Sequence, residues 1–185
     1  MNTSFNFLNV PQELSHADLA KKVFQACHLT GDFLLRSGIR STEYFDKYRL
    51  EANPELLFHI ANKMKNLIPA DTQVLAGLEM GGIPIATALS LLTGIPLCFV
   101  RKEAKEYGTC QFAEGTDIKG KKVCIIEDVI TSGGQVLLST DDLRGTGAEV
   151  NSVLCIINRG GDEAEKKLRL HNLKLHSLFI KSDFN

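Results

Sequence analysis

A short apolar run that ends in two acids and a glycine-rich turn constrains this chain more than any other feature. It occupies residues 123–135, with the sequence VCIIEDVITSGGQ. The four apolar residues at its start indicate a buried parallel strand, which we expect to end at Glu127 and Asp128. A helical apolar pattern follows the turn at 131–134. Strand, acids, turn and helix in this order predict an α/β unit whose helix N-terminus offers backbone N–H groups to an anion.

The two acids give this turn a more specific chemistry. Carboxylates at the carboxyl end of a strand can hold ribose hydroxyls or a hydrated Mg²⁺ ion. Together with the anion-binding turn, they suit a ribose that carries a phosphate. The stretch is neither a Walker loop nor a dinucleotide GxGxxG motif. Similar turns also occur in α/β proteins that bind no ligand. Other segments of the chain are therefore needed to distinguish a binding site from a structural turn.

Strand and helix patterns alternate from Gln73 onward, which predicts a mainly parallel sheet with helices on both faces. We expect one domain over 1–185, with a small helix-hairpin hood over about 1–50 and the core over about 51–185. The expected hood elements are a helix at 15–29 and strands at 33–35 and 44–48. The expected core elements are helices at 54–67, 84–92, 135–144 and 162–170 and strands at 73–78, 96–100, 123–126, 149–157 and 173–180.

Four loops follow the ends of the predicted parallel strands, at 79–82, 101–108, 127–134 and 158–161. Ligands bind beyond the carboxyl ends of the strands in such sheets. The loops bring glycines, cations and acids to one edge, which predicts a site for a ribose and two or more phosphates. Residues 101–120 are polar with no sustained apolar period, so we expect either a binding loop or a solvated charged loop.

Composition excludes several other classes. The chain has 185 residues, 44% of them hydrophobic, and a formal net charge of −1, so no basic field argues for nucleic acid. Five cysteines without CxxC spacing indicate reduced thiols in a cytoplasmic protein. The N-terminus does not read as a signal peptide. Prolines and a glycine interrupt the apolar residues 83–100, which favours a buried helix and strand over a membrane span.

The stretch at 123–135 resembles the phosphoribosyl pyrophosphate (PRPP) motif of type I phosphoribosyltransferases. Four other segments resemble the orotate phosphoribosyltransferases, and the similarity runs from about Ala17 to Phe184. These segments are GDFLLRSGIRSTEYFD, GLEMGGIPIATALS, FVRKEAKEYG and INRGG. The resemblance implies the type I phosphoribosyltransferase fold. It also implies transfer of the phosphoribosyl group from PRPP to orotate, giving orotidine 5′-monophosphate and diphosphate in pyrimidine biosynthesis.

The resemblance also implies roles for individual residues. Lys105 and Asp128 would be catalytic, and Glu127 and Asp128 would be outer-shell contacts of a Mg²⁺ ion that arrives with PRPP. A homodimer is implied, in which the 101–116 loop completes the neighbour's site. Orotate would be bound by Arg36, Tyr44, Phe45, Thr131 and Arg159. PRPP would be bound by Arg101, Lys102, Lys105, Tyr107, Glu127, Asp128, Val129, Ile130, Thr131, Ser132, Gly133, Gly134 and Gln135.

Two other functions stay open at this point: a purine-type phosphoribosyltransferase, and a regulator that senses PRPP without catalysis. The hairpin predicted within residues 31–50 argues against the first, and Lys105 argues against the second.

Five positions depart from the family pattern. Gly81 stands where some members have lysine, Tyr107 where histidine is usual, and Gln135 where a small hydroxyl residue or alanine is usual. Arg36 stands where lysine is frequent, and Asn158 stands where aspartate is usual.

Overall fold

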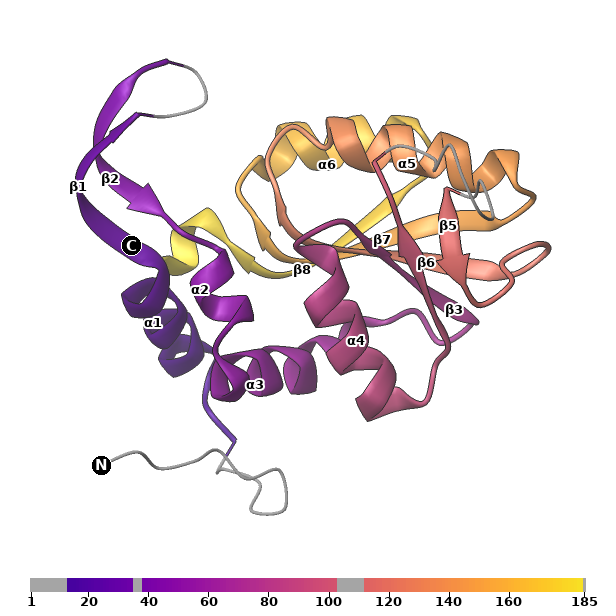
Figure 1. Ribbon diagram of the computed structural model, residues 1–185, viewed down its shortest axis with the longest axis horizontal. Helices are drawn as coiled ribbons and strands as arrows, with labels where there is room; N and C mark the ends of the chain where they lie inside the picture. The colour runs from indigo at the N-terminus through magenta and orange to yellow at the C-terminus, as the bar shows by residue number, and fades with distance from the viewer. Residues whose placement is uncertain (1–12, 35–37, 103–111, 185) are drawn as a thin grey trace.

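A computed structural model describes residues 13–34, 38–102 and 112–184. Its centre is a six-stranded sheet in the order β5-β4-β3-β6-β7-β8 (Figure 1). The strands are β3 (Val74–Leu78), β4 (Leu97–Val100), β5 (Ala113–Gly115), β6 (Lys122–Ile130), β7 (Glu149–Asn158) and β8 (Lys174–Ile180). All neighbouring pairs are parallel except β4 and β5, which are antiparallel. The predicted mainly parallel sheet is therefore confirmed.

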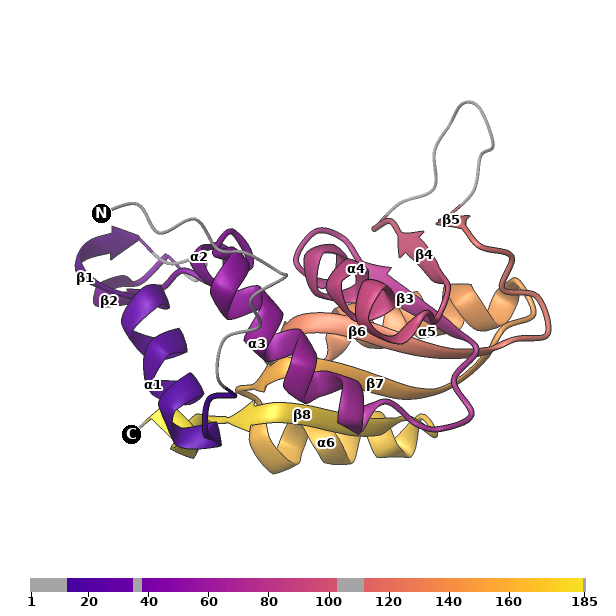
Figure 2. The same ribbon diagram turned by 90° about the horizontal axis from the view of Figure 1, so that it is seen from below.

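Helices cover both faces of the sheet, as predicted (Figures 1 and 2). On one face lie α3 (Pro54–Met64), continued by the 3₁₀ turn η1 (Lys65–Leu67), and α4 (Gly82–Thr93). On the other face lie α5 (Gly134–Gly145) and α6 (Gly161–Leu170). Among the helices of the described ranges, none is both long and apolar enough to cross a bilayer.

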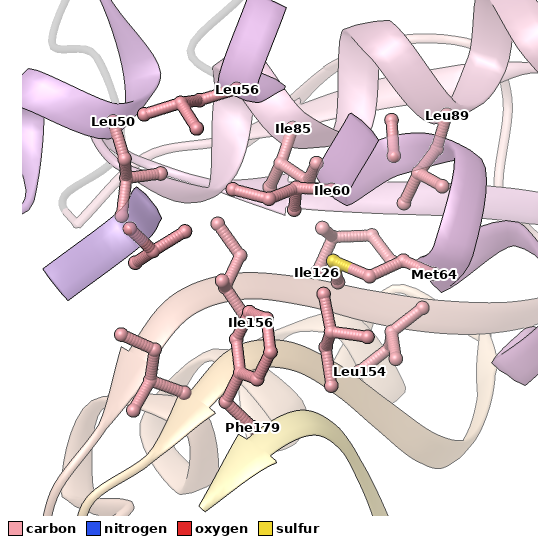
Figure 3. Packing of buried hydrophobic residues seen from close by; sticks show 14 of the residues in the cluster. Leu50, Leu56, Ile60, Met64, Ile85, Leu89, Ile126, Leu154, Ile156 and Phe179 are labelled. Carbon is pink, nitrogen blue, oxygen red and sulfur yellow. The ribbon is translucent and has the colours of Figure 1, made fainter. Parts of the chain in front are cut away.

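Apolar side chains from the strands pack against these helices in two clusters, one on each face. Figure 3 shows the cluster beneath α3 and α4, where residues of β6, β7 and β8 meet both helices. The start of α3 follows from its sequence, because the Asn53 side chain accepts the N–H groups of Glu55 and Leu56 and Pro54 takes the first helical position. The labelled residues of this cluster are Leu50, Leu56, Ile60, Met64, Ile85, Leu89, Ile126, Leu154, Ile156 and Phe179.

The N-terminal elements lie at one end of the sheet (Figures 1 and 2). They are α1 (His16–Cys27), capped by the Ser15 side chain, the antiparallel hairpin β1 (His28–Leu34) and β2 (Arg40–Phe45), and the single turn α2 (Tyr48–Glu51). The C-terminal 3₁₀ turn η2 (Lys181–Phe184) packs against α1. The chain end thus returns to the hairpin end of the molecule.

Two expectations in this region were wrong at their boundaries. The helix predicted to reach residue 29 ends at Cys27, because His28 is already extended and pairs with Phe45. The strand predicted over 44–48 ends at Phe45, and the chain turns into α2. The carbonyl of Cys27 accepts the N–H of Asp46 at 2.8 Å, which closes the hairpin before that turn.

Two further differences concern the sheet. Residues 113–115 form β5, although no structure was predicted there, because a three-residue polar strand leaves no periodic signal. The strand predicted over 123–126 runs on to Ile130, so both acids are strand residues. The ten-residue strand β7 extends the ladder, pairing Cys155 with Glu127 and Asn158 with Ile130.

Candidate functional site

The glycine-rich turn places the start of α5 at the carboxyl end of β6. Gly133 has a φ of +70°, a conformation that favours glycine. The Ser132 hydroxyl accepts the Gly134 N–H at 3.5 Å, and no side chain caps the helix. The Gln135 amide donates to Ser139 at 3.4 Å, so this side chain runs along the helix. The N–H groups at this end are left without a side-chain cap, which is the arrangement that an anion site requires.

A second loop braces this turn from the end of β7. The N–H groups of Arg159 and Gly160 both donate to the carbonyl of Ile130, at 2.8 and 3.2 Å. A Cβ atom on Gly160 would overlap the carbonyl oxygen of Thr131 and lie 2.5 Å from the Cβ of Ala164. The loops at 127–134 and 158–161 are therefore in direct backbone contact, as their predicted convergence requires.

The two acids of β6 differ in environment. The Asp128 side chain is fully buried, and the Lys47 ammonium lies 2.5 Å from its Oδ2 atom. Glu127 is half-buried. A Cβ atom on Gly81 would overlap the Asp128 carboxylate and lie 3.0 Å from Glu51 Oε1. Two carboxyl groups thus face the backbone of the 79–82 loop, where only glycine fits.

Burial and mutual contact separate the protonation of these acids. Burial first, and the Asp128 carboxylate second, raise the pKa of Glu51 to about 8. The same two causes hold the pKa of Glu127 well above its ordinary value. Burial would raise the pKa of Asp128 as well, but contacts with Glu127, Glu51 and Lys47 outweigh it and lower that pKa. Within this cluster the pKa of Asp128 is therefore lowered, while the pKa values of Glu51 and Glu127 are raised.

The loop after β3 and the start of the loop after β4 meet at a cavity of about 220 Å³. The Glu79–Met80 peptide bond in the first loop is cis. Arg101 borders this cavity, and its Nε lies 3.0 Å from Glu114 Oε1 on β5. Lys102 is exposed. Lys105 and Tyr107 lie outside the described residues. The cavity lining is Glu79, Ile83, Phe99, Val100, Arg101 and Glu114.

A larger cavity, of about 460 Å³, lies between the hairpin and the end of β7. It brings together three residues predicted to bind orotate, Tyr44, Phe45 and Arg159. Thr131 does not line it, and Arg36 lies outside the described residues. Its remaining lining consists of Phe24, His28, Ser41, Glu43, Ile157, Lys181 and Phe184.

Several residues at the site were missed by the sequence reasoning. Lys181 directly follows β8, which is parallel to β7, so a strand-end rule applied to the last strand would have found it. Lys47 and Glu51 lie in and beside α2, and no pattern in the sequence links them to Asp128. Conversely, the Ile130 side chain is buried and Val129 packs against the core, so these two residues offer a ligand only their backbone.

Known proteins are similar to this chain. Residues 48–177 match the family model described as "Phosphoribosyl transferase domain". The chain is 56% identical over 143 residues to an orotate phosphoribosyltransferase of Nocardioides sp., covering 77% of this chain and 80% of the relative. It is 42% identical over 155 residues to that of Methanocella arvoryzae, covering 83% and 87%.

Solved structures of orotate phosphoribosyltransferase also superpose on this chain. Orotate phosphoribosyltransferase of Mycobacterium tuberculosis H37Rv, crystallised with Fe(III) dicitrate, superposes with a TM-score of 0.80 at 27% identity, over 92% of this chain and 98% of that one. The same enzyme in complex with PRPP superposes with a TM-score of 0.77 at 26% identity, over 91% and 98%. An uncapped helix start, two adjacent acids and an aromatic-lined cavity meet at one sheet edge in a chain with these relatives. The chain therefore belongs to the orotate phosphoribosyltransferase family, within the type I phosphoribosyltransferases.

Proposed function

We infer that this protein transfers the phosphoribosyl group from PRPP to orotate, giving orotidine 5′-monophosphate and diphosphate, a step of pyrimidine biosynthesis. One observation carries this conclusion. The anion-binding start of α5, the acids of β6 and the cavity lined by Tyr44, Phe45 and Arg159 lie at the same edge of the sheet, in a member of the orotate family.

The reaction needs positioning rather than an enzyme nucleophile. A ring nitrogen of orotate forms a bond to C1 of the ribose, while the bond from C1 to the diphosphate oxygen breaks and its electron pair leaves with diphosphate. The transition state resembles an oxocarbenium ion, so orientation and charge stabilisation supply the catalysis. The first N–H groups of α5 would bind the 5′-phosphate. Arg159 would pair with the orotate carboxylate, and Tyr44 and Phe45 would line the ring.

The leaving diphosphate would be bound by Arg101, Lys102, Lys105 and Tyr107. Arg101 would exchange its partner Glu114 for diphosphate oxygens, since both are anionic acceptors of the guanidinium group. Each charge-assisted hydrogen bond contributes roughly 1.5–3 kcal/mol. Removing a donor that acts in the transition state costs about 100-fold or more in rate.

Mg²⁺ would accompany PRPP. Within the described ranges, no group of three or more histidine, cysteine or acidic side chains is arranged to hold a metal ion. Glu127 and Asp128 nevertheless suit outer-shell contacts, because Mg²⁺ prefers oxygen ligands and retains several waters. When bound, the ion would act as a Lewis acid that neutralises charge on the diphosphate.

Several features of the assembly belong to the same proposal. The chain would act as one phosphoribosyltransferase domain over 1–185, and as a homodimer in which the 101–116 loop completes the neighbour's site. It would work in the cytoplasm without nucleic acid or membrane partners. The buried free thiols of Cys27, Cys98, Cys124 and Cys155 support a reducing compartment.

The test is orotate consumption. Purified protein with Mg²⁺ and PRPP is expected to deplete the orotate absorbance and to produce diphosphate in equal amount. Turnover of a purine base instead of orotate would assign the protein to the purine-type enzymes. Binding of PRPP without turnover of either base would assign it to the regulators.

A further inference from the structure

Lys47 lies outside the four loops that follow the parallel strands, yet its ammonium group reaches the buried carboxylate of Asp128. It sits between β2 and α2, immediately before the first residue of that helical turn. Its Nζ atom is 2.5 Å from Asp128 Oδ2 and 5.3 Å from the centre of the Tyr48 ring. A contact between elements 81 residues apart in the chain (128 − 47) thus joins the N-terminal segment to the end of β6.

Burial distinguishes this ion pair from the surface pairs of the molecule. The Asp128 side chain has no exposed area, whereas that of Lys47 is 33% exposed. For comparison, the Lys122–Asp71 pair has a similar separation of 2.9 Å, but its side chains are 50% and 65% exposed. Water can replace either partner at such a surface pair, whereas the Asp128 carboxylate is held by the protein groups around it.

The two oxygens of Asp128 have different surroundings. Oδ1 accepts the backbone N–H of Val129 at 2.5 Å. Oδ2 lies at Lys47 and against the backbone of Gly81. A carboxylate oxygen has more than one acceptor site, so Oδ2 can accept a ribose hydroxyl while it remains beside the ammonium group. Lys47 and the Val129 N–H thus contact opposite oxygens of the same carboxylate.

We propose that Lys47 is a positioning residue for phosphoribosyl transfer: it holds the Asp128 carboxylate against the 79–82 loop, in the orientation that receives the ribose of PRPP. This role rests on the proposed function, because it assigns the ribose to Asp128. Lys47 acts through Asp128, so its loss affects the use of PRPP far more than the use of orotate.

The test begins with Lys47→Met, which keeps the length of the side chain and removes its charge. We expect kcat/KM for PRPP to fall by about 100-fold, the loss usual when one partner of a buried charge pair is removed. The KM for orotate should stay within about twofold, because the orotate cavity is lined by other residues. Lys47→Arg restores the charge and should recover most of the loss.

A double-mutant cycle decides whether Lys47 works through Asp128. Asp128→Asn alone should impair the reaction, and adding Lys47→Met to it should cost little more. If the losses in kcat/KM of the two single variants multiply in the double variant, the proposal is overturned. A wild-type kcat/KM for PRPP in Lys47→Met would also overturn it. Equal losses towards both substrates with a lowered melting temperature would show a structural role instead.

Lys122→Met is the matched control, because it removes a lysine ion pair of similar length far from the acids, and it should keep full activity. If Lys47→Met does not fold, Lys47→Gln serves in the same comparison. If the wild-type protein turns over no orotate, the proposed function fails. Calorimetric titration with PRPP and Mg²⁺ then still tests Lys47, since Lys47→Met must bind at least about tenfold more weakly.

Discussion

The contact between the turns after β6 and β7 predicts a large effect of one added methyl group at Gly160. A Cβ atom there would overlap the carbonyl oxygen of Thr131 and lie 2.9 Å from its carbonyl carbon. It would also lie 2.5 Å from the Cβ of Ala164 on α6. Backbone atoms and a helical Cβ cannot rotate away as a long side chain can. Gly160→Ala must therefore move one turn relative to the other.

The size of the effect follows from the kind of atoms involved. Overpacking a well-packed site costs typically about 1–3 kcal/mol, and a backbone overlap belongs at the upper end of that range. A chain of 185 residues loses about 2–4 °C in Tm for each kcal/mol, so a cost of 2–3 kcal/mol corresponds to roughly 4–12 °C.

Activity should fall further than stability suggests. Thr131 belongs to the turn that binds the sugar phosphate, and a displacement of about 1 Å at a reacting group can cost on the order of 100-fold in rate. We expect kcat/KM for PRPP to drop at least tenfold at a temperature where the variant is fully folded.

Thermal unfolding followed by circular dichroism measures the stability, and orotate depletion measures the activity. Gly145→Ala is the control, because a Cβ at the last residue of α5 meets nothing within 4 Å. It should leave Tm unchanged or raise it, since alanine favours helix over glycine by up to about 1 kcal/mol. Equal Tm and activity for Gly160→Ala and the wild type would refute the inferred contact between the turns.

The remaining predictions concern the thiols, the metal and the subunits. Burial raises the pKa of Cys27 and Cys124 to about 11 and that of Cys98 to about 12, and it raises the pKa of Cys155 further. These thiols stay neutral at pH 8. In a Cys110→Ser background, which leaves only these four thiols, we therefore expect no reaction with DTNB until urea unfolds the protein. Fast labelling of the native protein would contradict the burial. Chelation by EDTA should abolish turnover while Tm in the absence of PRPP stays constant, because the ion is proposed to arrive with its substrate; a fall in Tm would instead reveal a structural metal. Lys105→Ala should lose rate with modest loss of nucleotide binding, and mixing it with Asp128→Asn should restore part of the activity through the mixed dimer; a mixture as inactive as its parents would argue against a shared site.

Much of the architecture was predictable, because the apolar pattern of a buried strand and the loop at its end are local features. The strand that contains Glu127 and the strand that precedes Arg159 were found in this way, and their parallel pairing brings the loops together. The length of β6 was not predictable, since its last residues depend on pairing with β7 rather than on their own composition.

The acid cluster could be predicted from the sequence only in part. Asp128 was identified from the residues around it, whereas Lys47 and Glu51 reach it through the packing of a single helical turn that carries almost no periodic signal. The same reasoning could not foresee that Asp128 would be fully buried and Glu127 half-buried, because both acids were expected at the end of the strand and not within it. Contacts between distant segments decide such differences.

The hydrogen bond between the ends of β4 and β5 sets a distance limit on any shared site. The N–H of Arg101 donates to the carbonyl of Phe112 at 3.0 Å. The two residues that flank the segment between β4 and β5 therefore lie next to each other. Lys105 is four residues from Arg101, and an extended chain spans at most about 3.3–3.6 Å per residue, so its Cα lies within roughly 14 Å of that anchor. A dimer in which Lys105 serves the other subunit must bring Arg101 of one protomer within this radius, plus one lysine side chain, of its partner's bound diphosphate. Cross-linkers of known span can measure that spacing without any assay of catalysis.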